Sequence, residues 1–386
     1  MIQKEYIATG SIKRCKDRLR SFAGRNIFLV TGKTSYARSR AKEFLHDILS
    51  NYNVTIFNKF SPNPKIRDVK RGIDLFGKNK TDIVMAIGGG SSIDMAKLIN
   101  LFSVNKMDNA SLVKLKSKIK KPKPLIAIPT TAGSGSEATH FAVVYKGYRK
   151  YSVAHKYILP DVAIVDANLT MSLTKKQTAI SGMDALSQAI ESYWSINATA
   201  QSKRYAKEAI KLIQSNLTIA VAKKTKRSYE AMAKAAHLAG KAINITKTTA
   251  PHAVSYAITT FYNIPHGHAV SLTMPKFFTV NANLKSAVLN EQRGKGYLTK
   301  TINEIRKLFG CTTSLDFEKK WYKLMSQVGL ESDLKKLGIC KQSDIDRIIN
   351  NVNVERLGNN PLRINRTILR QVFKSLCANN KLKMGK

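Results

Sequence analysis

The sequence predicts an α/β domain over residues 1–168 and an all-helical domain over residues 169–386. Up to about residue 168, short apolar runs rich in β-branched residues alternate with amphipathic stretches, a pattern typical of buried strands and covering helices. From Leu169 onward helical periodicity dominates, with breaks near 195–200, 263–267, 310–313 and 358–361. A chain of 386 residues is long enough to bury the core of one or two such domains.

The first strong strand signal sets the pattern for the elements after it. The run NIFLVT over residues 26–31 is apolar and β-branched, and Gly32 ends it, so it predicts a buried strand followed by a turn. By the same criteria we expect strands at 54–57, 82–87, 125–129, 142–145, 151–154 and 162–165. Amphipathic stretches at 38–49 and 65–76 predict helices, and the lysine-rich stretch 109–123 predicts an exposed helix and loop.

Two segments of small residues follow predicted strands and indicate a site for a phosphate-bearing ligand. GGGSSIDMAK, which begins at Gly88, follows the apolar run DIVMAI. Glycine lets the backbone approach a diphosphate without a Cβ atom in the way, and the free N–H groups of the next helix attract its charge. TTAGSGSEAT, which begins at Thr130, offers backbone groups and hydroxyls to a cofactor. A tight turn and a flexible surface loop are the alternative interpretations.

The composition narrows the class of protein. We see no apolar run long enough to cross a bilayer, and the first ten residues lack a signal-peptide apolar region. The four cysteines form no CxxC pair, which fits a reducing cytoplasm. Lys and Arg number 65 against 25 Asp and Glu, a formal net charge of +40. Because the basic residues are scattered, with no basic tail or RNA-binding aromatic motif, we expect a basic surface and no specific nucleic-acid partner.

Three of the seven histidines lie between Thr246 and His268. His252 and His266 are 14 residues apart, and the sequence AVSYAITTF between them predicts a helix, followed by a break at 263–267. A helix followed by a turn can return the second imidazole to the first, and two neutral imidazoles facing one point suit zinc or ferrous iron. Two unrelated histidines, one packed in the core and one in a turn, are the alternative.

A second predicted helix offers further ligands. The stretch GMDALSQAIESYWS over residues 182–195 is amphipathic, and Asp184 and Gln188 share one face because residues i and i+4 are neighbours on a helix. A carboxylate at this position would join the two imidazoles of His252 and His266 in one metal site.

These segments together resemble the iron-containing (group III) alcohol dehydrogenases over essentially the whole chain. The metal motif of that family reads Asp-Ala-Leu-x-His-Ala-x-Glu, followed later by His-Ala and Pro-His-Gly. The matching residues are Asp184, Ala185, Leu186, Ala189, Glu191, His252, Ala253, Pro265, His266 and Gly267. GGGSSIDMAK, PTTAGSGSEAT, LPDVAIVD and the NNP segment near Asn359 are also similar to the family. Two positions depart: Gln188 replaces a histidine ligand, and Tyr256 replaces a histidine that many members carry close to the nicotinamide.

The resemblance implies a dehydroquinate-synthase-like fold, with an α/β cofactor-binding domain followed by a helical metal-binding domain. It implies a divalent ion, Fe(II) or Zn, held by Asp184, His252 and His266, with Gln188 as a weaker ligand. It also implies a nicotinamide cofactor bound at Gly89, Gly90, Ser91, Asp94, Thr130, Thr131, Ser134, Thr139 and Lys150. Members that prefer NAD often carry an aspartate after the first strand, whereas this chain has Gly32 and then Lys33. We therefore expect a preference for NADPH, or use of both NADPH and NADH.

Within the family, the segments VTGKTSY, SPNPK and TKTTAPHAVSY are most similar to the phosphonoacetaldehyde reductases, which reduce phosphonoacetaldehyde to 2-hydroxyethylphosphonate. The resemblance then implies metal-assisted hydride transfer to a small aldehyde, in a cytoplasmic homodimer. Tyr256 and His268 are candidates for returning a proton. Lys247 is a candidate for binding the phosphonate, and a solvated residue at a helix start is the alternative for it.

Three other functions stay open. The chain can be a general alcohol dehydrogenase, or a lyase or synthase on the same scaffold, because a fold alone does not set a function. It can also be a non-catalytic protein that binds polyanions, as its charge and Gln188 suggest. Oxidation of NAD(P)H with several aldehydes separates the first two from each other, and the salt dependence of nucleic-acid binding tests the third.

Overall fold

The computed structural model divides into two compact units. The residues that it describes are 3–108, 115, 119–147, 149–284, 288–339 and 341–378. The first unit comprises Met1–Thr174 and Lys224–Gly240, and the second comprises Lys175–Lys223 and Lys241–Lys386. Most of the lysine-rich stretch at 109–123 lies outside the described residues. The domain boundary expected after residue 168 stays a prediction.

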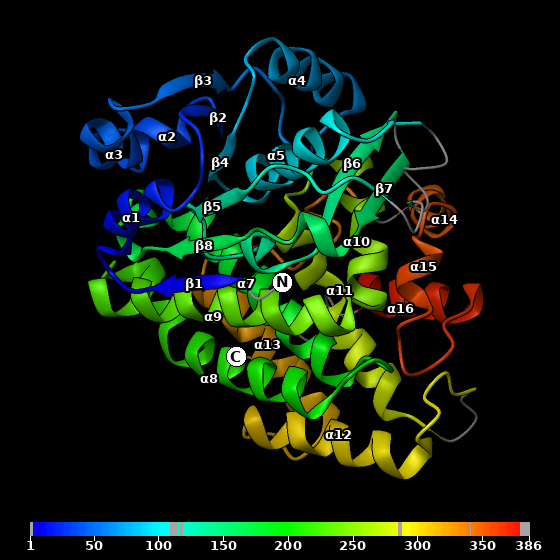
Figure 1. Cartoon of the computed structure of the whole chain (residues 1–386). Helices are drawn as coiled ribbons and strands as arrows, with labels where there is room; N and C mark the ends of the chain where they lie inside the picture. The colour runs from blue at the N-terminus through cyan, green and yellow to red at the C-terminus, as the bar shows by residue number, and fades with distance from the viewer. Residues whose placement is uncertain are drawn as a thin grey trace. The chain divides into compact units, whose positions relative to one another are not determined.

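A six-stranded parallel sheet lies at the centre of the first unit (Figure 1). In spatial order its strands are β1 (Lys4–Ile7), β8 (Val162–Val165), β5 (Leu125–Pro129), β4 (Ile83–Gly88), β2 (Asn26–Thr31) and β3 (Asn53–Phe57). Every pair of neighbours in this order is parallel. The predicted α/β class is therefore confirmed, with β2, β3, β4, β5 and β8 at the positions that the apolar runs indicate.

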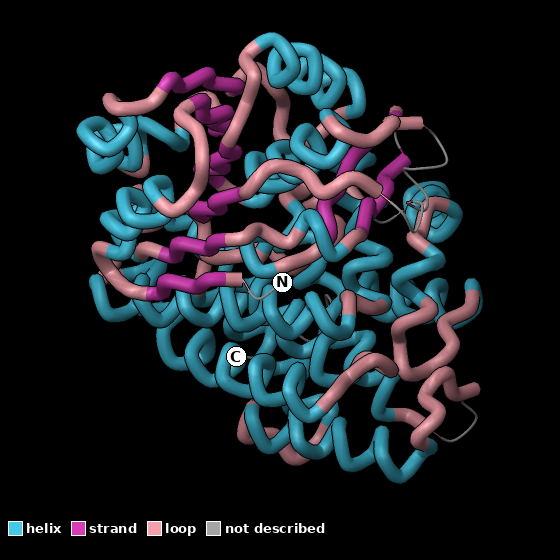
Figure 2. The backbone as a smooth tube through the Cα atoms, viewed as in Figure 1, coloured by secondary structure: helices cyan, strands magenta, loops and turns pink. Residues whose placement is uncertain are grey.

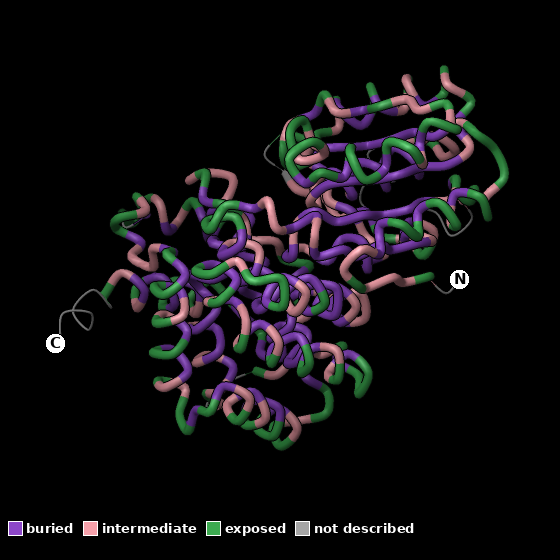
Figure 3. Tube along the Cα trace, turned by 90° about the vertical axis from the view of Figure 1, so that its left-hand side faces the viewer, coloured by how far each residue is buried: buried purple, intermediate pink, exposed green. Residues whose placement is uncertain are grey.

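Helices cover both faces of this sheet. They are α1 (Arg14–Arg20), α2 (Ser35–Arg38), α3 (Ala41–Leu49), α4 (Ile66–Lys78) and α5 (Gly90–Ser103). Ile27 and Leu29 of β2 pack in one apolar cluster with residues of α1 and α3, and Phe28 and Val30 pack in another with residues of α4 and α5. Burial on both faces explains why the inner strands β2, β4, β5 and β8 are continuously apolar instead of alternating. In Figure 3 the strands are mostly in the colour of buried residues.

Three details differ from or extend the sequence prediction. The predicted helix at 38–49 is in two pieces, α2 and α3, because Arg40 between them adopts a left-handed φ of 61°. β1 was not predicted, because its four residues KEYI are only partly buried at the edge of the sheet and form no apolar run. The strands expected at 142–145 and 151–154 are confirmed as an antiparallel pair, β6 (Phe141–Lys146) and β7 (Arg149–Ala154).

The sheet reverses its direction of winding between β2 and β4. β3 lies on one side of β2 and β4 on the other, so the turns after β2 and β4 are neighbours at the carboxyl edge of the sheet. Ligands of open α/β sheets bind at such a switch point. Gly32 follows β2, and Gly88 to Gly90 connect β4 to α5. The glycine segments singled out in the sequence therefore lie at the edge that the topology favours for a ligand.

The second unit is built from helices (Figure 2). They are α7 (Lys175–Trp194), α8 (Ala200–Ala222), α10 (Ala250–Tyr262), α11 (His266–Ala282), α12 (Gly294–Leu308), α13 (Ser314–Gln327), α14 (Gln342–Asn350), α15 (Val354–Leu357) and α16 (Arg366–Ala378). α9 (Lys226–Thr246) begins in the first unit and ends in the second. Every residue of α7 from Gly182 to Trp194 is buried, so its polar side chains need partners. Across the described residues, each helix falls short of the length and apolar character that a membrane crossing requires.

Candidate functional site

Three side chains of the second unit converge on one point. Asp184 on α7, His252 on α10 and His266 on α11 each place one possible ligand atom within 4.8 Å of the other two. His252 Nε2 lies 3.4 Å from Asp184 Oδ1, and the centroids of the two imidazole rings are 5.2 Å apart. Asp184 and His252 are buried, and His266 is partly exposed. We call these three residues the ligand cluster.

The turn between α10 and α11 returns His266 to His252. α10 ends where Asn263 adopts a left-handed φ of 53°, and Pro265 comes directly before the first residue of α11, which is His266. Asparagine tolerates the left-handed region, and proline is favoured where a helix begins. The helix and the break predicted from the sequence around residue 263 are therefore confirmed.

Gly267 allows α11 to approach α7 closely. A Cβ atom at position 267 would lie 2.2 Å from the carbonyl oxygen of Ile180 and 2.7 Å from the Cβ atom of Asp184. No other residue fits there without moving one of the two helices. The glycine after His266 is therefore what lets this imidazole reach the carboxylate on α7.

Glu191 holds His252 in position. Its Oε1 accepts hydrogen bonds from the backbone N–H groups of Thr249 (2.9 Å) and His252 (3.2 Å) at the start of α10, and its Oε2 accepts one from His252 Nδ1. The carboxylate thus caps α10 and orients the imidazole so that Nε2 faces Asp184. The sequence motif contains Glu191, but its partners are about 60 positions away along the chain, and no local pattern predicts them.

The electrostatic environment of His252 favours a positive charge. Burial disfavours the imidazolium, but the charges and hydrogen bonds of Glu191 and Asp184 outweigh it and raise the pKa of His252 to about 9. At neutral pH the imidazole is therefore protonated as long as no cation occupies the cluster. A metal ion must displace this proton, so its binding strengthens as the pH rises.

The atoms of the cluster fit a divalent ion. His252 Nε2 and Gln188 Oε1 are buried, and neither has a hydrogen-bond partner among the described residues. Gln188 lies one helical turn after Asp184 and is 4% exposed. Buried polar atoms usually have a hydrogen-bond partner, so two without one beside a carboxylate indicate a missing ligand, and a cation suits the carboxylate. Imidazole, carboxylate and amide oxygen donors suit Fe(II) or Zn, and the amide is the weakest of them.

The two candidates for proton transfer have different surroundings. Tyr256 stacks on His266 with ring centroids 5.5 Å apart, and the side chains of Thr248 and Arg356 lie near its hydroxyl. Burial raises the pKa of Tyr256, so the hydroxyl keeps its proton at neutral pH. The Nε2 of His268 instead lies 2.6 Å from the backbone oxygen of Glu331, to which it donates a hydrogen bond. The structure thus places Tyr256 against the cluster and His268 against a loop.

In the first unit, the turns after β4 and β5 meet. The N–H of Thr130 donates to the carbonyl oxygen of Gly88 (2.9 Å), and a Cβ atom at Gly90 would lie 2.6 Å from Ser134 Oγ. Gly88 has φ of 154°, and Gly89 is the N-cap of α5, so α5 starts with its free N–H groups at this turn. Two of the expected cofactor segments are therefore side by side, with Ser91 in the first turn of α5 and Thr131 in the neighbouring loop.

Other expected cofactor residues hold this region together. Asp94 accepts hydrogen bonds from the Ser136 hydroxyl and from the N–H of Val143 (3.0 Å), and Lys150 lies near enough to lower the pKa of Asp94, although burial raises that pKa overall. Lys97, the last residue of GGGSSIDMAK, was not predicted as a residue of this site.

Lys97 is 1% exposed, and its ammonium group donates to the backbone oxygens of Ser136 (2.6 Å), Thr139 (2.7 Å) and Phe141 (3.0 Å). Burial lowers the pKa of Lys97 to about 8. The ammonium group thus fixes the end of the loop that begins at Thr130.

Lys33 and Lys247, the two lysines expected to bind the cofactor and the phosphonate, both have side chains that reach solvent. Lys33 is exposed in the turn after β2, directly after Gly32. The Lys247 side chain is 38% exposed, and its Nζ forms an ion pair of 3.1 Å with Glu355. Lys247 itself adopts a left-handed φ of 59° between α9 and α10.

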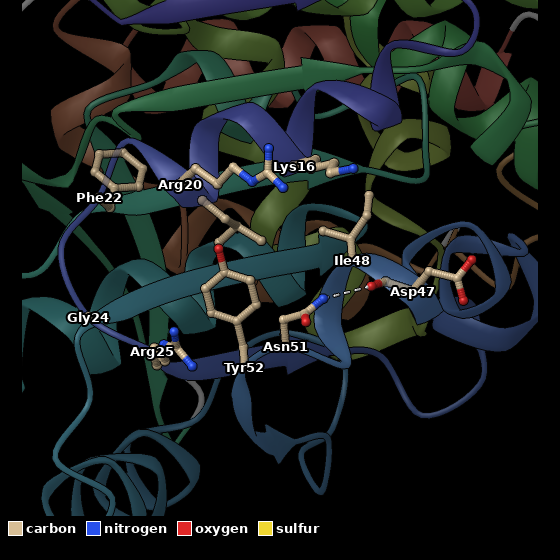
Figure 4. Close-up of a pocket in the computed structure, with 10 residues that line it drawn as sticks. Lys16, Arg20, Phe22, Gly24, Arg25, Asp47, Ile48, Asn51 and Tyr52 are labelled. Carbon is tan, nitrogen blue, oxygen red and sulfur yellow. Dashed lines mark hydrogen bonds between the residues drawn. The ribbon is translucent and has the colours of Figure 1, made fainter.

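A cavity of about 530 Å³ lies at the opposite edge of the sheet (Figure 4). Lys16, Arg20 and Tyr52 line it, beside the turns that lead into β2 and β3. The glycine segments follow the carboxyl ends of the strands, whereas this cavity lies at their amino ends. It is therefore a separate basic surface and no part of the expected cofactor site.

Comparison with known proteins gives a consistent result. The sequence model of the family described as iron-containing alcohol dehydrogenase matches residues 3–167, and that described as Fe-containing alcohol dehydrogenase family, C-terminal, matches residues 178–377. The NAD-dependent methanol dehydrogenase of Bacillus methanolicus is 35% identical over 284 residues, which are 72% of this chain and 74% of that protein. The 1,3-propanediol dehydrogenase of Citrobacter freundii is 32% identical over 276 residues, or 70% and 71% of the two chains. Among solved structures, the sulfoacetaldehyde reductase from Bifidobacterium kashiwanohense in complex with NAD+ gives a TM-score of 0.84 at 30% identity, with 98% of each chain covered.

Proposed function

Since the chain belongs to the iron-containing alcohol dehydrogenase family, we propose that it reduces a small aldehyde to a primary alcohol with NAD(P)H and a divalent metal ion. The observation that carries this proposal is the ligand cluster of Asp184, His252 and His266, whose ligand atoms lie within 4.8 Å of one another. We also propose that the enzyme is a cytoplasmic homodimer, as its family resemblance and its cysteine usage suggest.

The residues of the second unit have distinct roles in this proposal. Asp184, His252 and His266 hold the ion, with Gln188 as a fourth, neutral ligand. When bound, the ion supplies Lewis-acid polarisation of the aldehyde oxygen. Glu191 keeps His252 in the tautomer that presents Nε2, because it accepts the hydrogen bond from Nδ1. The role of these buried residues is to hold the donors in place before the substrate arrives.

The first unit supplies the cofactor site in this proposal. The N–H groups at the start of α5 and the loop from Thr130 to Thr139 bind the diphosphate of the nicotinamide cofactor, which supplies the hydride. Gly32 leaves room for a 2′-phosphate, and Lys33 offers it a positive charge. We therefore propose that NADPH is preferred or that both cofactors are used.

Tyr256 is the better placed of the two candidates to serve the proton transfer. Its hydroxyl is protonated at neutral pH, and its ring packs on His266. It can therefore donate a hydrogen bond to the oxygen that gains charge during the reaction. His268 has its Nε2 occupied by the backbone of Glu331, which favours a structural role.

We propose an aldehyde that carries an acidic group, with phosphonoacetaldehyde as the substrate. Local segments of the sequence are most similar to phosphonoacetaldehyde reductases, and one solved structure with 30% identity is a sulfoacetaldehyde reductase. Both aldehydes place a tetrahedral oxyanion one methylene group from the carbonyl. A reductase for this class of compound needs a cation near the ligand cluster.

The test is a panel of aldehydes with each cofactor. Phosphonoacetaldehyde, sulfoacetaldehyde and 3,3-dimethylbutanal have similar shapes, but only the last is neutral. We expect kcat/KM for one or both anions to exceed that for the neutral aldehyde by about ten- to a hundredfold, the value of a charge-assisted contact. Equal values for all three would leave a general aldehyde reductase, and no turnover of any aldehyde would contradict the proposed function.

A further inference from the structure

Arg356, on α15, is a buried cation near the ligand cluster. It is 4% exposed, which is the same depth as His252 at 3% and Asp184 at 7%. The N–H of Asn353 donates to the carbonyl oxygen of Ala253 (3.2 Å), which directly follows His252. The side chain of Asn353 in turn accepts a hydrogen bond from the N–H of Arg356 (2.9 Å). The backbone of α15 is thus attached to the helix that carries the first imidazole.

Tyr256 connects the guanidinium to the cluster. The side chains of Arg356 and of Thr248, which is 5% exposed, lie close enough to the hydroxyl of Tyr256 to lower its pKa, although burial raises that pKa overall. The ring of Tyr256 stacks on the imidazole of His266, with an angle of 20° between their planes. A single side chain therefore separates the guanidinium from one of the three proposed metal ligands.

The chemistry of the guanidinium suits a tetrahedral oxyanion. Arginine is charged at every pH at which a protein stays folded, and its planar fork of N–H donors matches two oxygens of a phosphonate or sulfonate. A charge at this depth is screened less by water and salt than one at the surface. Lys247, the cation singled out in the sequence, is in contrast 38% exposed and paired with Glu355.

We propose that Arg356 and Thr248 form the subsite that binds the oxyanion of an anionic aldehyde, with the carbonyl group of the substrate at the ligand cluster. This inference rests on the proposed function and adds to it the residues that recognise the acidic group. Tyr256 then lies between the two ends of the substrate, where its hydroxyl contacts the guanidinium and its ring contacts His266. Phosphonate and sulfonate share the chemistry that this subsite recognises.

The experiment compares Arg356→Gln, Lys247→Met and the wild-type enzyme in their metal-loaded forms. Each is assayed with phosphonoacetaldehyde, sulfoacetaldehyde and the neutral 3,3-dimethylbutanal. We expect Arg356→Gln to lower kcat/KM for the anionic aldehydes by about ten- to a hundredfold more than for the neutral aldehyde, whose change reports the lost contact with Tyr256. Lys247→Met removes the same formal charge from the neighbouring surface and should change little. The anion that the wild type prefers identifies the head group.

Two measurements separate substrate binding from damage to the site. Calorimetric binding of 2-hydroxyethylphosphonate and of 2-hydroxyethanesulfonate should weaken in Arg356→Gln, while its metal content stays at the wild-type value. If this variant does not fold, Arg356→Lys serves instead, because it keeps the charge and loses the fork. It should show a smaller loss that is again larger for the anions than for the neutral aldehyde.

The outcomes that overturn the inference differ from those that overturn the proposed function. If the wild type reduces all three aldehydes and the Arg356 variants lower kcat/KM equally for all three, Arg356 does not bind the oxyanion. The proposed reductase activity would still stand. A loss for the anions in Lys247→Met in place of Arg356→Gln moves the subsite to Lys247. A wild type that reduces none of the aldehydes with either cofactor contradicts the proposed function and the subsite together.

Discussion

At the scale of single residues, one buried carboxylate sets the chemistry of the ligand cluster. Glu191 accepts the hydrogen bond from His252 Nδ1 and leaves Nε2 as the atom that faces Asp184. Gln188, one turn from Asp184 on the same helix, brings a neutral amide oxygen with no hydrogen-bond partner among the described residues. An amide oxygen is a poorer ligand than imidazole for Fe(II) or Zn. We therefore expect this site to hold its ion less tightly than a site with three histidines.

Gln188→His should tighten metal binding, because an imidazole replaces the weakest donor. The measurement is the metal that stays bound during dialysis against a chelator, and the variant should retain more than the wild type. Gln201→His on the exposed face of α8 adds a histidine away from the cluster and serves as the control. Equal loss from Gln188→His and the wild type would show that residue 188 does not face the ion.

The sequence was sufficient to select the three cluster residues, but not their partners. Local periodicity places Asp184 and Gln188 on one helix face and separates His252 from His266 by one helix and one turn, and the resemblance to the family's metal motif selects these residues as ligands. Glu191 and Arg356 act on residues about 60 and 100 positions away. Such pairs depend on how whole helices pack, and no local pattern in one sequence contains that information.

At the scale of elements, a buried histidine joins three parts of the first unit. His237 on α9 lies 3.1 Å from Glu137 in the loop after β5, and 3.5 Å from Glu5 on β1. Burial disfavours its charge, but the hydrogen bonds and charges of the two glutamates outweigh burial and raise the pKa of His237 to about 9. At neutral pH, a fully buried imidazolium therefore connects β1, α9 and the loop expected to bind the cofactor.

This pKa predicts how stability depends on pH. Because the pKa is raised from its ordinary value of 6.5 to about 9, the stabilisation is fully present below pH 6.5 and is lost as the pH rises through 9. We expect His237→Asn to lower the free energy of unfolding by up to about 3 kcal/mol near pH 6, with the difference from wild type shrinking above about pH 9. Denaturant titrations at several pH values measure it.

His46→Asn is the matched control for this prediction. The His46 side chain is 77% exposed on α3, so its replacement removes a histidine without removing a buried contact. A difference between His237→Asn and the wild type that stays constant from pH 6 to pH 10 would show that the charge of His237 contributes nothing to stability.

The turn after β2 predicts the choice of cofactor. Gly32→Asp places a carboxylate where the family's NAD-preferring members often have one, so kcat/KM should move toward NADH relative to NADPH. A Cβ atom at position 32 would lie 2.4 Å from Ser35 Oγ, and Ser35→Ala removes this contact. The variant is therefore made with and without Ser35→Ala, and Ser35→Ala alone is the control. A wild type that strongly prefers NADH, or a variant with an unchanged preference, would show that Gly32 does not determine the choice of cofactor.

Elements were predictable from the sequence where burial on both faces makes a strand continuously apolar. β2 and β4 are such strands, and their predicted limits agree with the structure to within one residue. β1 is a short edge strand without an apolar run, so only its pairing with β8 reveals it. The break at Arg40 depends on a backbone angle that arginine rarely adopts, which a helical pattern does not show.

At the scale of the whole molecule, the positive charge is in keeping with an anionic substrate. The formal charge of +40 attracts both a phosphonate or sulfonate and a nicotinamide cofactor, and salt weakens this attraction. The fold was predictable at this scale because four motifs occur in the family's order along one chain. The substrate depends instead on a few side chains near the cluster, and the motifs do not contain them.

A metal titration of the protein stripped of metal tests the proposed metal site most directly. Fe(II) or Zn is added to the wild type, His252→Ala and His266→Ala, while calorimetry follows binding and NADPH oxidation follows the reduction of phosphonoacetaldehyde. We predict that wild-type activity returns in proportion to bound metal, and that both variants keep the wild-type circular dichroism spectrum but bind no metal and reduce no aldehyde. Near-wild-type turnover by the stripped protein or by both variants would contradict the proposed metal site.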